Sequence, residues 1–209
     1  MIYLFAKRAS DITGSLVGLA ALSLPMSFIA LLIKLDSRGP VFFRQERIGK
    51  DGKAFPIWKY RTMVVGAVNI GLGMRTSKED TRITRVGRVL RAFSLDELPQ
   101  LINVLKGDMS LIGPRPTIRH QVEQYTPRQR KRLLMRPGIT SLASVNGRND
   151  ISWGERIELD IKYVEHASPV MDLRIILKTF WVAFVTREGV YAGEGANDDF
   201  GRRDQVSGA

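Results

Sequence analysis

A run of 22 residues without a charged side chain, from Ile12 to Ile33, places the strongest constraint on how this chain folds. As one helix it would be about 33 Å long, which matches the roughly 30 Å hydrocarbon core of a bilayer. The run is longer than the apolar part of a secretory signal peptide, and no clear cleavage site follows it. A buried core helix is the soluble alternative, but its usual length is much shorter. We therefore expect a membrane segment.

Pro25, near the middle of this run, predicts that the helix is broken. Proline has no N–H for the carbonyl of Ala21, and its ring pushes that carbonyl aside. Because lipid offers no water to the freed carbonyls, Ser23 and Ser27 are expected to bond them. A spanning helix also tolerates such a kink, so the proline alone does not separate a re-entrant segment from a crossing one.

Charge favours the re-entrant arrangement. Basic residues flank the run at both ends, namely Lys7, Arg8, Lys34 and Arg38. Because basic flanks tend to stay in the cytoplasm, both ends are expected on that side of the membrane. We predict a re-entrant membrane helix in residues 1–38, broken near Pro25 with Ser23 at the break, and keep a spanning helix as the alternative.

After residue 38 the sequence has the pattern of an α/β domain, helix-rich with a small sheet, which we expect to cover residues 39–188. Short strands are expected at 41–43 and 55–58, around a turn at 49–52. A long loop is predicted at 64–78, and helices over 83–93, 96–105, 126–134, 151–165 and 171–186. Residues 189–209 are rich in Gly, Asp and Asn and are predicted to be a mobile tail.

The last predicted helix carries an apolar stripe that includes Ile175, Phe180 and Trp181. We expect this stripe to lie in the core of the domain. The alternative is a position in the membrane interface beneath the domain, which also suits an aromatic-rich helix face.

Composition narrows the function. The chain has 32 Lys and Arg against 21 Asp and Glu, a net charge of +11. Such an excess predicts an anionic partner: nucleic acid, a membrane surface or a phosphorylated substrate. The absence of cysteine excludes disulfide frameworks, thiolate nucleophiles and Cys-ligated metal centres, and two histidines leave no room for a multi-histidine site. A membrane-anchored nucleic-acid-binding protein stays open on charge, although no binding motif is recognisable.

Asp96 and Glu97 are adjacent carboxylates at an expected helix start. Acidic residues are common there because they cap the helix and offset its dipole, so a purely structural role is one interpretation. Pro99 suits Asp96 as the cap, because the proline then falls in the first turn. The pair directly follows a segment with arginine at every third position, and a catalytic pair is the other interpretation; those arginines are Arg82, Arg85, Arg88 and Arg91.

Three further arginines lie at rigid turns. Arg115 has proline on both sides, Arg136 precedes Pro137, and Arg148 follows Gly147. A braced guanidinium loses little conformational entropy when it binds, and its fork of donors suits phosphate. A single exposed arginine is usually only a solvated charge, but three braced ones indicate phosphate binding.

Six segments of the chain together resemble a known family, the monotopic phosphoglycosyl transferases, also called bacterial sugar transferases. The resemblance runs from Lys7 to about Thr186 and fits the small form of the family, a catalytic domain with its membrane anchor. The segments that carry it are VFFRQERIG at 41–49, KYRTM at 59–63, SLDELPQL at 94–101, NVLKGDMS at 103–110, IGPRP at 112–116, and 136–148.

The resemblance implies an enzyme of the bacterial cytoplasmic membrane, with a re-entrant helix and a catalytic domain on the cytoplasmic face. It would move a sugar phosphate from a UDP-sugar to polyprenyl phosphate and release UMP, with Mg²⁺ required. Asp96 would be the nucleophile, and Glu97 would help to hold the metal or steer the acceptor. Residues implied to bind phosphate or substrate are Arg91, Arg115, Arg148, Lys59, Arg61, Asn146 and Arg136.

Three positions depart from the family pattern. Ser141 stands where a glycine is common and Ser144 where a glutamine is common, in the segment expected to contact sugar or uridine. Leu24 precedes Pro25 where the family usually has serine. A membrane protein that keeps the fold without activity is therefore a further alternative, and both a monomer and a dimer stay open.

Overall fold

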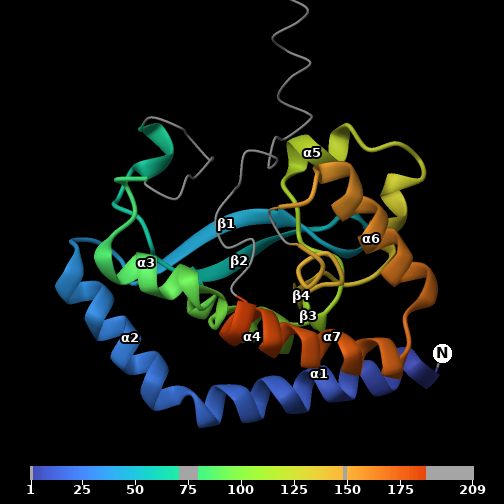
Figure 1. The fold of residues 1–209 in the computed structure, drawn as a ribbon, viewed down its shortest axis with the longest axis horizontal. Coiled ribbons are helices and arrows are strands. Elements are labelled where there is room, and N and C mark those ends of the chain that lie inside the picture. Colours follow the sequence, from blue (N-terminus) through green and yellow to red (C-terminus); the bar gives the residue numbers. More distant parts are fainter. Residues whose placement is uncertain (1, 71–79, 148–149, 187–209) are drawn as a thin grey trace, which may run out of the picture.

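The computed structural model describes residues 2–70, 80–147 and 150–186, and shows a mixed domain seated on a bent pair of helices (Figure 1). The pair consists of α1 (Ile2–Ala21) and α2 (Ser23–Asp36), and the chain bends by 63° from the axis of α1 to that of α2. Within the described residues no single helix has both the length and the apolarity to cross a membrane, but the bent pair taken together does, by length and composition.

The bend lies at Leu22, three residues before Pro25. This offset is expected, because a proline disturbs the carbonyls of the turn before it rather than its own position. Ser23 Oγ donates to the carbonyl of Ala20 at 2.9 Å, and Ser27 Oγ donates to that of Ser23 at 2.9 Å. Both serines therefore bond carbonyls near the break, as predicted, but the acceptors are Ala20 and Ser23 rather than Ala21, whose carbonyl the proline frees.

Polar contacts attach α1 firmly to the domain. Asp11, only 4% exposed, accepts hydrogen bonds from Ser110 Oγ and from the N–H of Leu111, both at 2.9 Å. Arg8 donates to the carbonyls of Val104 and Leu105 at 2.7 and 3.0 Å, where another helix ends. A buried carboxylate that accepts two hydrogen bonds is stable only if the partners stay in place, so these contacts set how α1 sits under the domain.

Two small sheets replace the single sheet that the sequence suggested. β1 (Phe42–Ile48) and β2 (Ala54–Tyr60) form an antiparallel hairpin, longer than the predicted strands, around the turn at 49–52. β3 (Ser110–Ile112) and β4 (Gly138–Thr140) form a short parallel pair that the sequence analysis missed. The second pair is too short to show the period-2 alternation by which strands are recognised.

Four of the five predicted helices are present with shifted ends; the one predicted over 126–134 is instead a 3₁₀ turn, and a short helix at Arg119–Glu123 was not predicted. α3 (Arg85–Ala92) begins after Thr84, whose Oγ1 accepts from the N–H of Gly87. The helix expected from residue 96 begins instead at Gln100, as α4 (Gln100–Lys106), and ends at Gly107 in the left-handed conformation as predicted. The remaining elements are the helices α5 (Arg119–Glu123), α6 (Trp153–His166) and α7 (Pro169–Trp181), the 3₁₀ turns η1 (Lys50–Gly52), η2 (Ala67–Asn69) and η4 (Gln129–Leu134), and the π turn η5 (Val182–Thr186).

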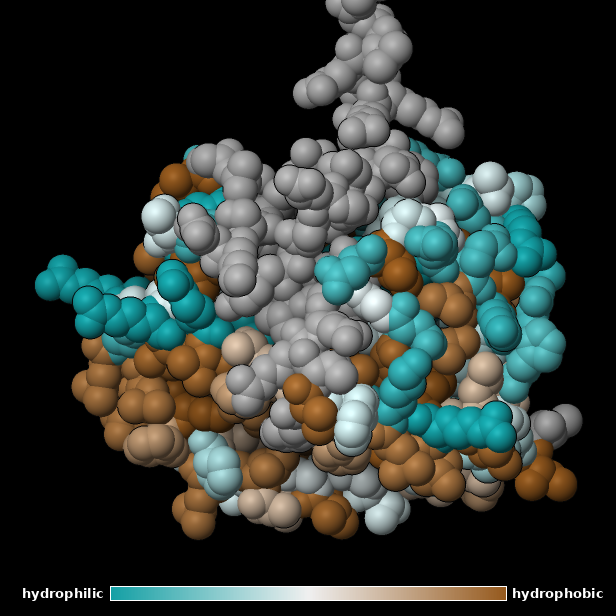
Figure 2. Space-filling view, in the orientation of Figure 1, coloured by the Kyte–Doolittle hydropathy of each residue, from teal (hydrophilic) through white to brown (hydrophobic). Residues whose placement is uncertain are grey.

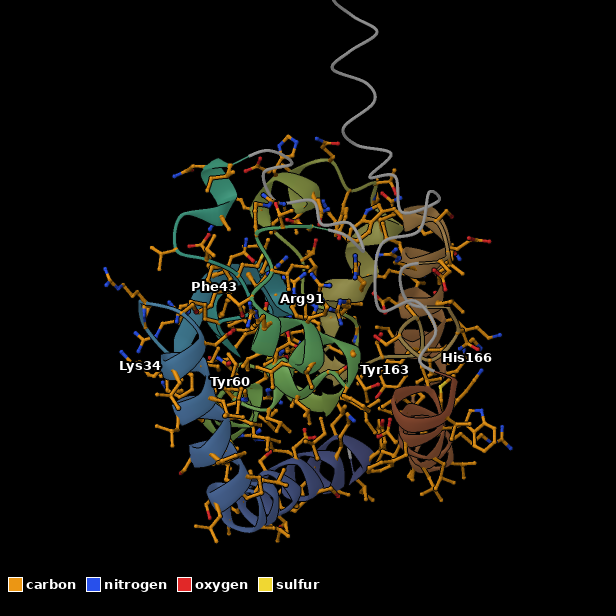
Figure 3. The ribbon with its side chains drawn as sticks, turned by 60° about the vertical axis from the view of Figure 1, so that its left-hand side comes forward. Lys34, Phe43, Tyr60, Arg91, Tyr163 and His166 are labelled. Carbon is orange, nitrogen blue, oxygen red and sulfur yellow. The ribbon has the colours of Figure 1, made fainter. Side chains whose placement is uncertain are left out.

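Several small apolar clusters hold these layers together. Tyr60 and Leu90 pack with Ile29 and Ile33 of α2, which joins the hairpin and α3 to the bent pair. In Figure 3 Tyr60 lies between the ribbon of the hairpin and α2, and its hydroxyl donates to the carbonyl of Met26 at 2.9 Å. Each buried aliphatic side chain contributes about 1.5–3 kcal/mol, so this cluster anchors the site-bearing segments to α2.

The apolar stripe of α7 corrects one prediction. Ile175 is buried and Ile176 packs against its cluster, but Phe180 and Trp181 are 61% and 58% exposed, so only part of the stripe is core. The neighbouring Leu173 and Leu177 are exposed as well. α7 lies beside α1 in Figure 1, and Figure 2 shows apolar surface gathered along the same side of the molecule, over α1 and α2. The apolar side chains of these helices therefore form one face, the arrangement that the interface alternative describes.

Candidate active site

Asp96 and Glu97 lie on a tight turn between α3 and α4. The turn is the 3₁₀ segment η3 (Leu95–Glu97), entered through Ser94, which has a φ of 57°. A non-glycine residue in the left-handed region is uncommon, and such residues concentrate at functional sites. The carboxylates thus project from a turn that precedes α4, rather than from the first turn of a helix as predicted.

Glu97 is held by two cations from different elements. Lys59 of β2 reaches Glu97 Oε1 with a 2.7 Å ion pair, and Arg115 Nη2 lies 3.2 Å from the same oxygen. The side chain of Glu97 is only 12% exposed, whereas that of Arg115 is 42% exposed. Glu97 is therefore the buried member of this ion pair, and the Arg115 side chain is the member that is accessible from solvent.

Asp96 is half-buried in the same cluster of charges. Burial raises the pKa of Asp96 above its ordinary value, and the neighbouring Glu97 carboxylate raises it further. The charges of Lys59, Arg91 and Arg115 act in the opposite direction. Poor solvation makes a carboxylate a stronger nucleophile than one in water, and the cations keep a share of it ionised, which together suit covalent chemistry.

Arg91 reaches this cluster from the end of α3. Its Nε donates to Thr62 Oγ1 at 2.9 Å, just after β2. α3 comes this close because Gly87 has no side chain: a Cβ there would lie 2.1 Å from the carbonyl oxygen of Thr62. Figure 3 shows Arg91 at the centre of the molecule, on the helix that leads into η3.

Arg115 is positioned by a buried ion pair that the sequence analysis did not single out. Asp160 of α6 accepts from the N–H of Arg115 at 3.3 Å, and Arg132 donates to the carbonyl of Arg115 at 2.8 Å. Asp160 and Arg132 also bond each other, at 0% and 3% exposure. The backbone of Arg115 is thus fixed on both sides, in addition to the two flanking prolines.

Asn103 is a second positioning residue without a predicted role. Its Oδ1 accepts from the N–H of Trp58 at 3.0 Å, and its Nδ2 donates to the carbonyl of Pro56 at 2.8 Å. This fully buried side chain of α4 bonds β2 as a neighbouring strand would, beside Lys59. Its place in the NVLKGDMS segment was the available signal, since a buried asparagine needs partners for all its polar atoms.

The structure does not bring every predicted binding residue to the carboxylates. Arg61 is 5% exposed and donates to the carbonyls of Ile33, Ser37 and Arg38 at the end of α2, so it anchors the helix instead. Arg136 donates to the carbonyl of Gly107 at the end of α4.

The turn that carries Asn146 and Gly147 lies beside α6 and α7. Asn146 accepts from Lys178 of α7 at 2.7 Å and lines a surface cleft of about 590 Å³ with residues of α6. Arg148, residues 71–78 of the predicted loop and the predicted tail at 189–209 lie outside the described residues.

The two serines that depart from the family pattern are partners. Ser141 Oγ lies 2.8 Å from Ser144 Oγ and accepts from the N–H of Ser144 at 2.9 Å. Such a serine turn replaces the conformational freedom of a glycine with a local hydrogen bond. The substitutions therefore preserve an ordered turn.

The carboxylates of Asp96 and Glu97 are of the ligand type that Mg²⁺ prefers, because their donor atoms are oxygens. Within the described residues no group of three or more His, Asp or Glu side chains is placed to hold a metal. Mg²⁺, however, commonly binds through only one or two carboxylates together with substrate phosphates and water. Asp96 and Glu97 supply two hard oxygen ligands, so they fit a metal that arrives with a phosphorylated substrate.

A carboxylate pair beside several cations is a candidate site for a phosphorylated ligand, and comparison with known proteins gives the family. The family model described as bacterial sugar transferase matches residues 2–186. This chain belongs to the bacterial sugar transferase family and is a transferase. The resemblance inferred from the motifs is confirmed, and the nucleic-acid-binding alternative finds no support.

Individual relatives agree with the family match. "Uncharacterized sugar transferase EpsL" of Bacillus subtilis is 41% identical over 184 residues, 88% of this chain and 89% of that protein. "Undecaprenyl-phosphate galactose phosphotransferase" of Salmonella typhimurium is 38% identical over 201 residues, 90% of this chain but 42% of that protein. "UDP-glucose:undecaprenyl-phosphate glucose-1-phosphate transferase" of Escherichia coli is 41% identical over 189 residues, 87% of this chain and 40% of that protein. The chain spans less than half of these last two relatives.

Proposed function

We propose that this protein transfers a sugar 1-phosphate from a UDP-sugar to polyprenyl phosphate, through a covalent intermediate on Asp96, in the first membrane step of bacterial glycoconjugate synthesis. The observation that carries the proposal is the Asp96–Glu97 pair, with Lys59 and Arg115 on Glu97 and Arg91 beside Asp96. The names of the relatives, which act on undecaprenyl phosphate, agree with it.

The reaction divides into two displacements at one phosphorus. In the first, a carboxylate oxygen of Asp96 attacks the β-phosphorus of the UDP-sugar, and the bond to the bridging oxygen breaks. UMP leaves with that oxygen and the sugar phosphate stays on Asp96. In the second, an oxygen of polyprenyl phosphate attacks the same phosphorus, which frees the Asp96 carboxylate and forms the lipid diphosphate sugar.

The cations explain why a carboxylate can approach a diphosphate. Lys59, Arg91 and Arg115 surround the carboxylates, and charge-assisted hydrogen bonds of this kind contribute about 1.5–3 kcal/mol each. Asp96 and Glu97 would hold Mg²⁺, which when bound offsets the charge that builds up on the phosphoryl oxygens. Because the donor phosphate leaves before the acceptor phosphate arrives, one basic pocket can serve both.

The bent pair and the exposed face of α7 support a monotopic position on the inner face of the cytoplasmic membrane. In this arrangement α1 and α2 enter one leaflet and return, and the acceptor phosphate is held at the headgroup level near the site. Labelling of Ile2→Cys in intact cells, in this cysteine-free chain, tests the topology. Protection from a membrane-impermeant reagent is expected, and periplasmic labelling would mean that the segment crosses the membrane.

Trapping the intermediate tests the reaction directly. Incubation with donor labelled at the β-phosphate, without lipid, should leave label on the protein, and polyprenyl phosphate should then move that label into the lipid fraction. Asp96→Asn should acquire no label and release no UMP. Intersecting double-reciprocal lines together with an unlabelled protein would instead indicate direct transfer in a ternary complex.

The same assay distinguishes an active enzyme from an inactive relative and identifies the donor. UMP release from a panel of UDP-sugars should be largest for the natural sugar. No release from any UDP-sugar, with polyprenyl phosphate present, would support a membrane protein that has kept the fold without the activity.

A further inference from the structure

A second group of cations continues the site away from Asp96. Phe43 of β1 pairs with Lys59 of β2, and the side chains of paired residues share one face of the hairpin. Since side chains alternate along a strand, Gln45 and Arg47 lie on that same face. Lys59 contacts Glu97 from this face, so Arg47 lies farther along the surface that borders the carboxylates.

Three segments meet where β1 ends. The N–H of Ile48 donates to the carbonyl of Thr117 at 2.8 Å, and the side chain of Ile48 packs against Ile157 of α6. Each of these contact residues has an arginine within two positions along the chain. These arginines are Arg47, Arg115, Arg119 and Arg156; Arg119 pairs with the exposed Glu46 at 3.4 Å, which leaves Arg47, Arg115 and Arg156.

Two arginines of this cluster, Arg47 and Arg156, donate to neutral oxygens, which orient them. Arg47 Nη2 donates to Gln45 Oε1 at 2.7 Å, and Arg156 Nε donates to the carbonyl of Ile151 at 3.2 Å. Burial and the charge of Arg115 lower the pKa of Arg47 to about 10, and the Glu97 carboxylate acts in the opposite direction. Burial and the charges of Arg115 and Arg132 lower the pKa of Arg156, against the Asp150 and Asp160 carboxylates. Guanidinium groups held near one another against their repulsion are most stable with an anion between them.

The position of this cluster indicates which anion it takes. Arg91 and Lys59 lie near the end of the hairpin that is close to α2, where the Tyr60 hydroxyl donates to the carbonyl of Met26. β1 runs from there toward α6 (Figure 1). Arg156 lies ten residues before the end of α6, about 15 Å along the helix from the link to α7 and its apolar face. A water-soluble phosphate compound suits the α6 end better than a phosphate tethered to lipid.

We infer that Arg47 and Arg156, together with Arg115, form a subsite for the nucleotide-side phosphate of the donor diphosphate. This inference rests on the proposed function, which puts the sugar-side phosphate at Asp96. Arg115 lies between the two positions, since it contacts Glu97 and borders both outer arginines. The departing UMP would keep its phosphate in this subsite until it dissociates.

Binding of UMP to the full-length protein in lipid nanodiscs, at fixed Mg²⁺, tests the subsite. Arg47→Gln and Arg156→Gln should each raise the Kd for UMP at least tenfold. Arg44→Gln is the matched control: Arg44 lies on the opposite face of β1, over the ring of Trp58 at 3.7 Å, and its Kd should stay within twofold of the wild type. Unchanged UMP affinity in both variants would overturn the inference.

A second measurement separates the two sources of phosphate. Once Asp96 carries the labelled sugar phosphate, its discharge by polyprenyl phosphate should proceed within twofold of the wild-type rate in Arg47→Gln. Slower discharge with unchanged UMP affinity would assign the cluster to the lipid phosphate and refute the inference.

Two further outcomes keep the test decisive. If Arg47→Gln melts well below the wild type, Arg156→Gln, on a different element, decides by the same UMP measurement. If the wild-type protein never acquires label, the covalent mechanism fails, while the UMP affinities still test the arginine cluster.

Discussion

The buried arginines that hold this fold together and the arginines of the active site put the same side chain to opposite uses. Arg61, Arg82 and Arg132 are 3–5% exposed and donate to oxygens of the protein itself. Arg82, for example, pairs with Asp80 at 2.7 Å and donates to the carbonyls of Ala67 and Ile70. Arg115, in contrast, is 42% exposed on its side chain and lies beside a carboxylate at the open site.

The two groups of arginines differ in the acceptors to which their guanidinium N–H groups donate. A guanidinium surrounded by main-chain carbonyls is neutralised within the fold and has little left for a ligand. A guanidinium beside Asp96 and Glu97, such as that of Arg115, can exchange its contact with a carboxylate for one with a phosphate. Removal of an arginine from the first group should therefore lower stability, and removal of one from the second should lower the rate.

After Asp96→Asn, which should abolish the reaction, the largest effect is expected at Glu97, on which two site cations converge. Glu97→Gln removes the charge that Lys59 and Arg115 share, so both cations lose their orientation. We expect transfer to fall on the order of 1000-fold, about 4 kcal/mol of barrier. UMP release measures it, with Glu46→Gln, whose carboxylate is 60% exposed, as the control that should stay near wild type. Comparable losses in both variants would place Glu97 outside the catalytic machinery.

Arg132→Met tests the anchoring group. It leaves Asp160 buried without its charge partner, and loss of one member of a buried pair typically costs about 3–5 kcal/mol of unfolding free energy. Arg128→Met breaks the exposed pair with Glu158 at 2.7 Å and should cost less than about 1 kcal/mol. Urea denaturation compares the two, and equal stabilities would mean that Arg132 is not an anchor.

Arg115→Met should show the reverse pattern. The loss of one charge-assisted contact predicts a rate reduction of about 10- to 150-fold, with little change in Tm because the side chain is partly exposed. Arg119→Met, at a 58% exposed side chain that pairs with Glu46, should leave the rate unchanged. A large fall in Tm without a rate defect would move Arg115 into the anchoring group.

The most gradual expected effect is the pH dependence of the buried pair, which is spread from about pH 4 to 7. Burial raises the pKa of Asp160 to about 6, against the pull of Arg132. Between the unfolded value of about 3.9 and 6, the native state holds a proton that the unfolded chain has lost, so stability falls as pH rises through this window. The difference in unfolding free energy between wild type and Asp160→Asn should fall by on the order of 2–3 kcal/mol from pH 4 to 7. A constant difference would mean that Asp160 is ionised throughout.

Much of this protein was predictable from its sequence because the signals are local. The apolar run with Pro25 indicated the bent pair, and the bend appears one turn before the proline. The turn at 49–52 marked the hairpin, and Gly107 marked the end of α4. The Asp96–Glu97 pair and the proline-flanked Arg115 were candidates from spacing and residue type, and the structure brings them together.

Only the tertiary structure decided which basic side chains serve the site. The sequence treats Arg61 and Arg115 alike, as motif arginines, but the end of α2 supplies carbonyls that occupy the first. The Asp160–Arg132 pair joins residues 28 positions apart, and Asn103 bonds a strand 45 residues earlier in the chain. Spacing along the chain determines helices, turns and breaks because those interactions are local. Whether a charge is buried, paired or open to a ligand depends on segments that meet only after folding.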